Sequence, residues 1–217
     1  IVLGIASTRE SVTLMKMGQE ADAYQTLAYT DQMTGLNNRT CFNVDFAKLS
    51  ENPHDVAVID FDLNNLKYTN DTYGHSVGDA YIKSCATIIY EIFNGSEYAI
   101  PGGHVKIGKC YRVGGDEFVT LVENSSSIDM THYLAMLESS VDASNRESKH
   151  KHLKMQIAYG CATYTPDIDK NLEDTYNRAD KIMYKNRNSS VKRNIPKQKK
   201  QSTYNCFFCF GIIFRII

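Results

Sequence analysis

The pattern of apolar residues predicts a buried strand followed by two helices in the first half of the chain. Val56–Ile59 form a nearly continuous apolar run, which is typical of a central strand in a sheet. The segment 64–73 is expected to be a short helix that Gly74 ends. After it, with Ser76 as the predicted cap, apolar residues recur every three or four positions, which indicates a longer helix with one buried face.

A glycine pair separates two short predicted strands further along the chain. Tyr111–Val113 and Phe118–Val122 are expected to be strands, and Gly114-Gly115 between them suits a tight hairpin in which positive φ is needed. The stretch before this hairpin, 94–109, is rich in glycine and is expected to be a loop. The remaining patterns predict a helix, a strand and a last amphipathic helix at 128–148, 153–164 and 171–187.

The predicted elements follow the order helix, strand, helix, helix, strand, strand, helix, strand, helix, starting from a helix at about 7–30. Antiparallel strands with helices on one face give an α+β sandwich. The first helix has two interpretations: it packs on its own domain, or it is a dimerising signalling helix. We therefore expect an N-terminal signalling or linker helix, a main domain and a tail, at 1–30, 31–190 and 191–217.

Composition and charge narrow the classes of function. The length of 217 residues favours one domain with extensions, and a net charge of −1 gives no basic field that would attract nucleic acid. Six scattered cysteines favour reduced, buried thiols over a disulfide framework. Cys206 and Cys209 have the CxxC spacing without a second pair or a His pair nearby, so a zinc or redox site is the less favoured interpretation.

The two ends of the chain leave alternatives open. The chain begins with Ile1 rather than Met, so we expect a fragment whose upstream sensor module is missing. The apolar stretch 1–6 is much shorter than the roughly 20 residues that span a bilayer, and it is either the end of a membrane helix or the start of a soluble one. We expect a cytoplasmic domain in a parent protein that is soluble or membrane-anchored. The tail is basic and then strongly apolar, and its sequence predicts no role.

Three carboxylates are expected to meet at one edge of the sheet. Asp62 ends the buried strand, after Asp60 within it, and Asp116-Glu117 open the strand that follows the glycine pair. On neighbouring strands these groups would repel and raise each other's pKa, and a hard divalent cation such as Mg²⁺ would remove that cost. The alternative is that Asp116 and Glu117 are solvated turn residues and that Asp62 caps the next helix.

Polar residues after Asp62 are suited to a nucleotide. The segment Asn64–Lys67 opens the short helix, where free N–H groups and the Lys67 ammonium can meet phosphate oxygens. The amide of Asn70 and the carboxylate of Asp79 can together read the edge of a guanine. Taken singly, each residue has a plainer interpretation, because Asn70 fits a helix C-terminus and Asp79 fits the first turn of a helix.

Five ordered motifs resemble one known family, the GGDEF family of diguanylate cyclases. The resemblance implies a nucleotidyl-cyclase-like fold, a ferredoxin-like palm in which helices pack around an antiparallel-rich sheet. It also implies condensation of two GTP molecules into cyclic di-GMP and pyrophosphate by a homodimer. The motifs are DQMTGLNNR (31–39), DLNNLKYTNDTYGHSVGD (62–79), RVGGDEF (112–118), IAYGCATY (157–164) and RADKIMYKNR (178–187).

The resemblance also assigns roles to individual residues. It implies metal ligation by Asp62, the Leu63 carbonyl, Asp116 and Glu117, with Mg²⁺ or Mn²⁺ as cofactor and two ions in each site. It makes Lys67, Asp116 and Glu117 catalytic: one of the acids helps to deprotonate the attacking 3′-hydroxyl, and Lys67 is a cation on the phosphates. The implied substrate-binding residues are the guanine readers Asn70 and Asp79, His75 nearby, Gly114, Gly115 and Arg187.

The sequence departs from the family pattern at several positions. The family motif has an acid where Asn64 stands. Near the last helix the family has Ala-Lys and, four residues later, an Arg; here Asn186, Arg187 and Val191 occupy these positions, and Arg187 is expected to replace the Lys. The product-inhibition motif Arg-x-x-Asp is replaced by Val105–Gly108, so that site is expected to be absent.

Three hypotheses of function follow. The first is an active diguanylate cyclase that acts as a dimer on GTP, without a nucleic-acid partner. The second, motivated by the departures on the phosphate side, is a catalytically silent GGDEF domain that binds GTP as a regulatory module. The third is a palm-type polymerase or adenylyl cyclase, which shares the acids that bind metal and differs in its choice of nucleotide.

Overall fold

The computed structural model describes residues 15–16, 24, 26–100, 103–148 and 154–192. Most of the expected N-terminal helix, the tail beyond residue 192 and the two cysteines of the CxxC motif lie outside the described residues, although 26–29 are helical. None of the helices in the described part is both long and apolar enough to cross a membrane. The thiols of Cys41, Cys85, Cys110 and Cys161 are free, and the first three are buried.

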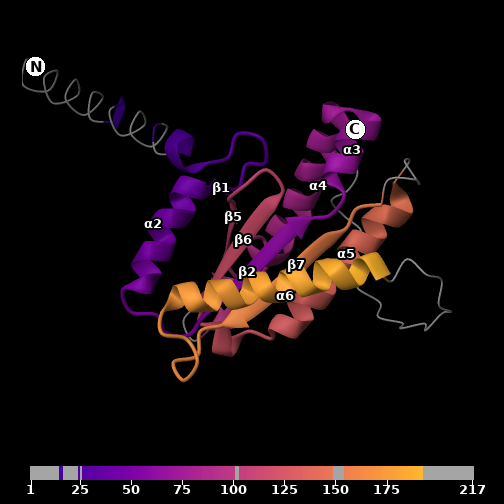
Figure 1. Ribbon diagram of the computed structural model, residues 1–217. Helices are drawn as coiled ribbons and strands as arrows, with labels where there is room; N and C mark the ends of the chain where they lie inside the picture. The colour runs from indigo at the N-terminus through magenta and orange to yellow at the C-terminus, as the bar shows by residue number, and fades with distance from the viewer. Residues whose placement is uncertain (1–14, 17–23, 25, 101–102, 149–153, 193–217) are drawn as a thin grey trace, which may run out of the picture.

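Five strands form a mixed sheet in the order β1-β5-β6-β2-β7 (Figure 1). The central strand β2 (Val56–Leu63) pairs antiparallel with β6 (Glu117–Glu123) on one side and with β7 (Ile157–Thr163) on the other. Beyond β6 lie the antiparallel β5 (Lys109–Arg112) and the short β1 (Asn37–Asn38), which is parallel to β5. The expected α+β class is confirmed, and the strands that carry the acids are neighbours.

Helices cover both faces of this sheet (Figure 1). One layer holds α4 (His75–Phe93) and α5 (Met130–Glu147), and the other holds α2 (Arg39–Ser50) and α6 (Leu172–Lys192). The pattern-based prediction of helices on one face was therefore wrong, because one helix's periodicity does not tell which face of the sheet it covers. The arrangement implied by the resemblance, with helices packed around the sheet, is confirmed.

Several elements were not predicted from the sequence, among them the short β1, helix α2 and a two-stranded hairpin. Helix α2 begins where the Asn38 side chain accepts a hydrogen bond from Cys41 N, but its apolar residues do not form one stripe. The hairpin of β3 (Glu97–Ile100) and β4 (Gly103–Lys106) lies in the stretch that was expected to be a loop. Strands of four residues are too short to give a reliable periodic signal.

The two faces of β2 differ in character. One face packs against α4 and α5 through Ala57, Ile59, Phe61 and Leu63. The other face begins with Val56 and Val58, in the cluster that includes α6 residues, and continues with Asp60 and Asp62. Both acids are buried, so β2 carries its carboxylates between the sheet and α6.

Candidate active site

The structure brings the three predicted carboxylates together where β2 ends and β6 begins. Asp62 lies opposite Glu117 in the antiparallel register, so their side chains leave the same face of the sheet. Leu63 N donates a hydrogen bond of 3.0 Å to Asp116 O, which joins the two strands at this point. Asp62 is buried, Asp116 is half-buried and Glu117 is exposed.

The turn between β5 and β6 runs from Val113 to Asp116. Val113 N and Gly114 N both donate to Glu117 O, at 3.0 and 3.3 Å. Neither Gly114 nor Gly115 adopts positive φ, so the predicted tight hairpin was wrong, because the longer turn closes with ordinary backbone angles. A β-carbon at 114 would overlap the end of the exposed Glu117 side chain, which can move away, whereas one at 115 would meet nothing within 4 Å.

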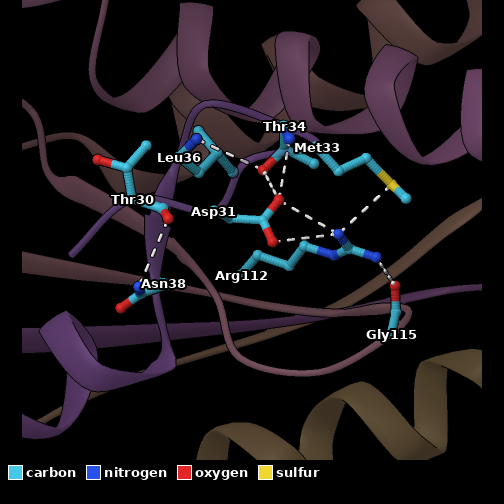
Figure 2. A network of polar contacts seen from close by, with 8 residues as sticks. All are labelled: Thr30, Asp31, Met33, Thr34, Leu36, Asn38, Arg112 and Gly115. Atoms are coloured by element: carbon cyan, nitrogen blue, oxygen red, sulfur yellow. Dashed lines mark hydrogen bonds and ion pairs between the residues drawn. The ribbon is translucent and has the colours of Figure 1, made fainter. Parts of the chain in front are cut away.

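A polar network holds this turn from the segment that follows the N-terminal helix (Figure 2). Asp31 accepts hydrogen bonds from Thr34 N at 2.9 Å and from Arg112 Nη1 at 3.2 Å, and Arg112 Nη2 donates to Gly115 O at 2.9 Å. Burial works against the charge of Asp31, but the bonds from Thr34 and Arg112 bring its pKa below the ordinary value. The motif DQMTGLNNR marked this segment, but sequence reasoning missed the network.

The two expected guanine readers lie on consecutive helices, Asn70 on α3 (Leu66–Tyr73) and Asp79 on α4. The helices meet at Gly74, whose φ of +87° only glycine adopts readily. The side-chain amide of Asn70 lies so close to Gly78 that a β-carbon at 78 would overlap Asn70 Oδ1. The Asn70 amide therefore lies against the start of α4, the helix that also carries Asp79.

The other predicted residues of this region are on the surface. Lys67 is exposed in the first turn of α3, and His75 is exposed as the first residue of α4, one residue before the predicted Ser76 cap. The N-cap residue of α3 is Asn65, in a left-handed conformation with φ of 65°. Asp62 therefore does not cap this helix, and that part of the alternative interpretation is excluded.

Tyr81 supports the loop that follows Asp62. Its buried hydroxyl lies 2.9 Å from Asn64 O and accepts a hydrogen bond of 2.9 Å from Gln156 N, just before β7. Burial raises the pKa of Tyr81, so the hydroxyl keeps its proton. The sequence places Tyr81 in the apolar stripe of α4, but it gives no signal for the contacts of the hydroxyl.

Asp60 adds a further buried acid to the face that carries Asp62. Its position in the strand is confirmed, and its side chain is on the α6 side with 5% exposure. Burial, followed by the charges of Asp180, Glu117 and Asp62, raises its pKa to about 7. Burial therefore disfavours the ionised form of the Asp60 carboxyl group beside Asp62.

Arg187 reaches from α6 to the predicted metal ligand Asp62. Arg187 Nη1 donates to Asp62 Oδ2 at 2.8 Å, and the two side chains are 44% and 7% exposed. Asp62 Oδ1 is buried and has no hydrogen-bond partner among the described residues. Burial raises the pKa of Asp62, and Asp116 and Glu117 add to this effect, whereas Arg187 opposes it. The resemblance implied that Arg187 binds the substrate, and the structure pairs it with a carboxylate.

The donors at this position suit a hard divalent cation. Carboxylate and carbonyl oxygens from Asp62, Leu63, Asp116 and Glu117 are the ligands that Mg²⁺ prefers, and the unpaired Asp62 Oδ1 is an acceptor that a cation would satisfy. Within the described part of the chain, no three acidic, His or Cys side chains are grouped closely enough to hold an ion. The chemical type of these residues and their positions on neighbouring strands therefore suit a metal ion. Their side chains would have to rotate in order to bind it.

Comparison with known proteins identifies the family. The profile described as "Diguanylate cyclase, GGDEF domain" matches residues 28–193. This chain belongs to the GGDEF family. Its GGDEF domain resembles diguanylate cyclase DgcS of Shewanella oneidensis, with 29% identity over 185 residues, 83% of this chain and 52% of the relative. It also resembles the probable diguanylate cyclase DgcJ of Escherichia coli, with 29% identity over 169 residues, 76% of this chain and 30% of the relative. The chain thus spans about half the length of these curated relatives, or less.

Solved structures of GGDEF domains share the fold. The coiled coil and GGDEF domain of DgcB from Caulobacter crescentus, in complex with c-di-GMP, matches with a TM-score of 0.64 and 21% identity, over 90% of this chain and 96% of that one. The GGDEF domain of DgcB alone matches with a TM-score of 0.56 and 25% identity, over 77% and 92%. The GGDEF fold implied by the sequence resemblance is confirmed.

Proposed function

We propose that residues 31–190 are the catalytic unit of a diguanylate cyclase, that residues 1–30 carry input from an upstream sensor, and that 191–217 form a separate tail. The unit would condense two GTP molecules into cyclic di-GMP and two pyrophosphates. One observation carries the proposal: Asp62 and Glu117 are opposite on neighbouring strands, with Asp116 joined to Leu63 beside them. Family membership and the position of the Asn70 amide against Gly78, at the start of the helix that carries Asp79, support it.

The metal would be held by Asp62, the Leu63 carbonyl, Asp116 and Glu117. We expect Mg²⁺ or Mn²⁺, with two ions in each site. When bound, the metal would neutralise charge on the phosphates and on the leaving pyrophosphate. The hydrogen bond from Leu63 N to Asp116 O already joins the two strands. Metal binding would therefore require the side chains to rotate while the strands stay in place.

The nucleotide would lie between the α3–α4 junction and the β5–β6 turn. The Asn70 amide would donate to a guanine acceptor, and the Asp79 carboxylate would accept from the ring N–H and the exocyclic amine. The open space at Gly115 would let the backbone approach the nucleotide. The remaining contacts are assigned to Gly114 on the same turn, His75 near the base, and Lys67 and Arg187 as cations on the phosphates.

The reaction would consist of two equivalent condensations. In each, the 3′-oxygen of one GTP attacks the α-phosphorus of the other, the hydroxyl proton passes to the Asp116 or Glu117 carboxylate, and the bond to pyrophosphate breaks. Each domain would bind one GTP, so two domains must face each other. We therefore expect a homodimer with two-fold symmetry.

The test is to incubate the full chain with GTP and Mg²⁺ and to separate the products by chromatography. Wild type should form cyclic di-GMP and pyrophosphate, and Glu117→Gln should form them at least about 100-fold more slowly. Glu51→Gln, which makes the same charge change at the exposed end of α2, should act like wild type. Turnover of ATP but not GTP, or no cyclic di-GMP from the wild-type dimer, would contradict the proposal.

A silent regulatory module remains the second candidate, because Arg187 is paired with Asp62 and Asn64 stands where the family motif has an acid. This candidate expects GTP to bind tightly, as measured by calorimetry, without any cyclic product. Formation of cyclic di-GMP by wild type at any rate that Glu117→Gln abolishes would exclude it.

A further inference from the structure

The part of α6 that precedes Arg187 is fixed on the sheet. Gly160 of β7 lies so close to α6 that a β-carbon there would overlap Ala179 O. Directly before Arg187, Asn186 Nδ2 donates to Tyr159 O at 3.0 Å. The backbone at Arg187 is therefore held beside β7, the strand next to β2, and the partly exposed guanidinium can change partners while the helix stays in place.

The buried carboxylate of Asp62 is stabilised by a positive charge beside it. Its side chain is only 7% exposed, it lies opposite Glu117, and Asp60 shares its face. The guanidinium of Arg187, at 2.8 Å, supplies this charge through Oδ2, while Oδ1 has no partner among the described residues. A divalent cation on the same carboxylate would face the guanidinium at a few ångströms, where like charges repel strongly in a partly buried site.

We propose that Arg187 is an internal counter-ion of Asp62, whose positive charge opposes the binding of a metal ion to the same carboxylate. The inference rests on the proposed function, because it takes Asp62 as a metal ligand. It adds a second role to a residue so far assigned to phosphate: the guanidinium competes with the metal. The guanidinium therefore weakens metal binding when no nucleotide is present. The affinity of the site for metal is then lower than four oxygen donors alone would give.

The Mn²⁺ affinity of the full chain without nucleotide, measured by electron paramagnetic resonance of free Mn²⁺, tests this inference. Arg187→Gln should bind Mn²⁺ at least about fivefold more tightly than wild type, because the competing charge is gone. Lys181→Gln removes an exposed positive charge from the same helix and should stay within about twofold of wild type. Arg187→Lys should fall between the two, because an ammonium holds a carboxylate less firmly than a guanidinium does.

Thermal unfolding supplies a readout that does not depend on turnover. In EDTA, Arg187→Gln should melt below wild type, because Asp62 has lost its counter-ion, and saturating Mn²⁺ should raise its Tm more than that of wild type. Lys181→Gln should show the wild-type response to Mn²⁺.

Mn²⁺ binding to Arg187→Gln that is no tighter than to wild type, or is absent, overturns the inference. If Arg187→Gln does not fold, Arg187→Lys decides, and an affinity equal to or below that of wild type overturns the inference. The proposed function fails separately: it fails if wild type forms no cyclic di-GMP, or if Asp62→Ala binds Mn²⁺ as wild type does.

Discussion

Asp169 is a buried carboxylate that organises the loop between β7 and α6. It accepts hydrogen bonds from Thr165 N, from Thr175 Oγ1 and from Arg178 through Nε and Nη2. The bonds from Arg178 are the main cause that lowers the pKa of Asp169. The loop, and with it the start of α6, therefore depends on the ionised form of this acid.

Asp169→Asn is expected to lower the free energy of unfolding by about 2 kcal/mol at pH 7, because Arg178 loses its buried partner. The folded pKa of Asp169 is below the unfolded one, so its contribution is fully present above the unfolded pKa and is lost as the pH falls through the folded value. Urea unfolding at pH 7 and at pH 3 should therefore show a smaller gap between variant and wild type at pH 3.

Asp167→Asn is the matched control, because Asp167 is exposed in the same loop. Its free energy of unfolding should equal that of wild type at both pH values. A gap for Asp169→Asn that did not change with pH would mean that the shape of the side chain, rather than its charge, holds the loop.

At the scale of elements, the β5–β6 turn is held by side chains from outside it. Arg112 Nη2 donates to Gly115 O, and Arg39 Nη1 donates to Val113 O at 3.2 Å. The same Arg112 is paired with Asp31, directly after the N-terminal helix. The position of the turn, and of the acids that follow it, is therefore coupled to the segment through which the helix enters the domain.

Arg112→Lys is expected to lower cyclic di-GMP formation at least about tenfold, while the free energy of unfolding falls by only about 1 kcal/mol. The reason is that an ammonium cannot contact Asp31 and Gly115 O with the geometry of a guanidinium, and small displacements of catalytic groups are costly. Product formation and urea unfolding, measured on the same preparation, test this. Arg146→Lys, in the last turn of α5, should change neither quantity. A loss of activity that only matched a loss of folded protein would contradict the prediction.

The contact between β7 and α6 is set by one glycine. A β-carbon at position 160 would overlap Ala179 O and Met183 N, which are backbone atoms that cannot move without the whole helix. Gly160→Ala is therefore expected to lower the free energy of unfolding by about 2 to 3 kcal/mol, measured in urea. Gly115→Ala, where the new methyl group meets open space, should stay within about 0.5 kcal/mol of wild type in the same assay. Equal stability for the two variants would mean that α6 shifts on the sheet at little cost.

At the scale of the whole molecule, the features that depend on local sequence were the predictable ones. The sequence predicted three features within a few residues: the apolar run of β2, the end of α3 at Gly74 and the last helix. It could do so because periodicity and helix ends depend on residues that are close together in the sequence. The second helical layer was not predicted in this way, since the choice of sheet face depends on the other helices. The resemblance to the GGDEF family, by contrast, did imply helices packed around the sheet.

The candidate site was predictable as a set of residues and not as a set of contacts. The order of motifs indicated Asp62 and Asp116-Glu117, and the register of β2 with β6 makes them neighbours. The pairing of Arg187 with Asp62, the acids around Asp60 and the contacts of the Tyr81 hydroxyl each join elements that are distant in the sequence. Their roles in binding and catalysis stay predictions until they are measured.

The pairing of Asp62 with Arg187 joins residues 125 positions apart, and this has a consequence for how the chain is made. During synthesis β2 and β6 emerge well before α6, and the face of β2 that carries Asp60 and Asp62 stays open to solvent until α6 covers it. Arg187 can pair with Asp62 only after it has left the ribosomal exit tunnel. The burial of Asp62 and the arrival of its guanidinium therefore coincide late in synthesis, because α6 brings both.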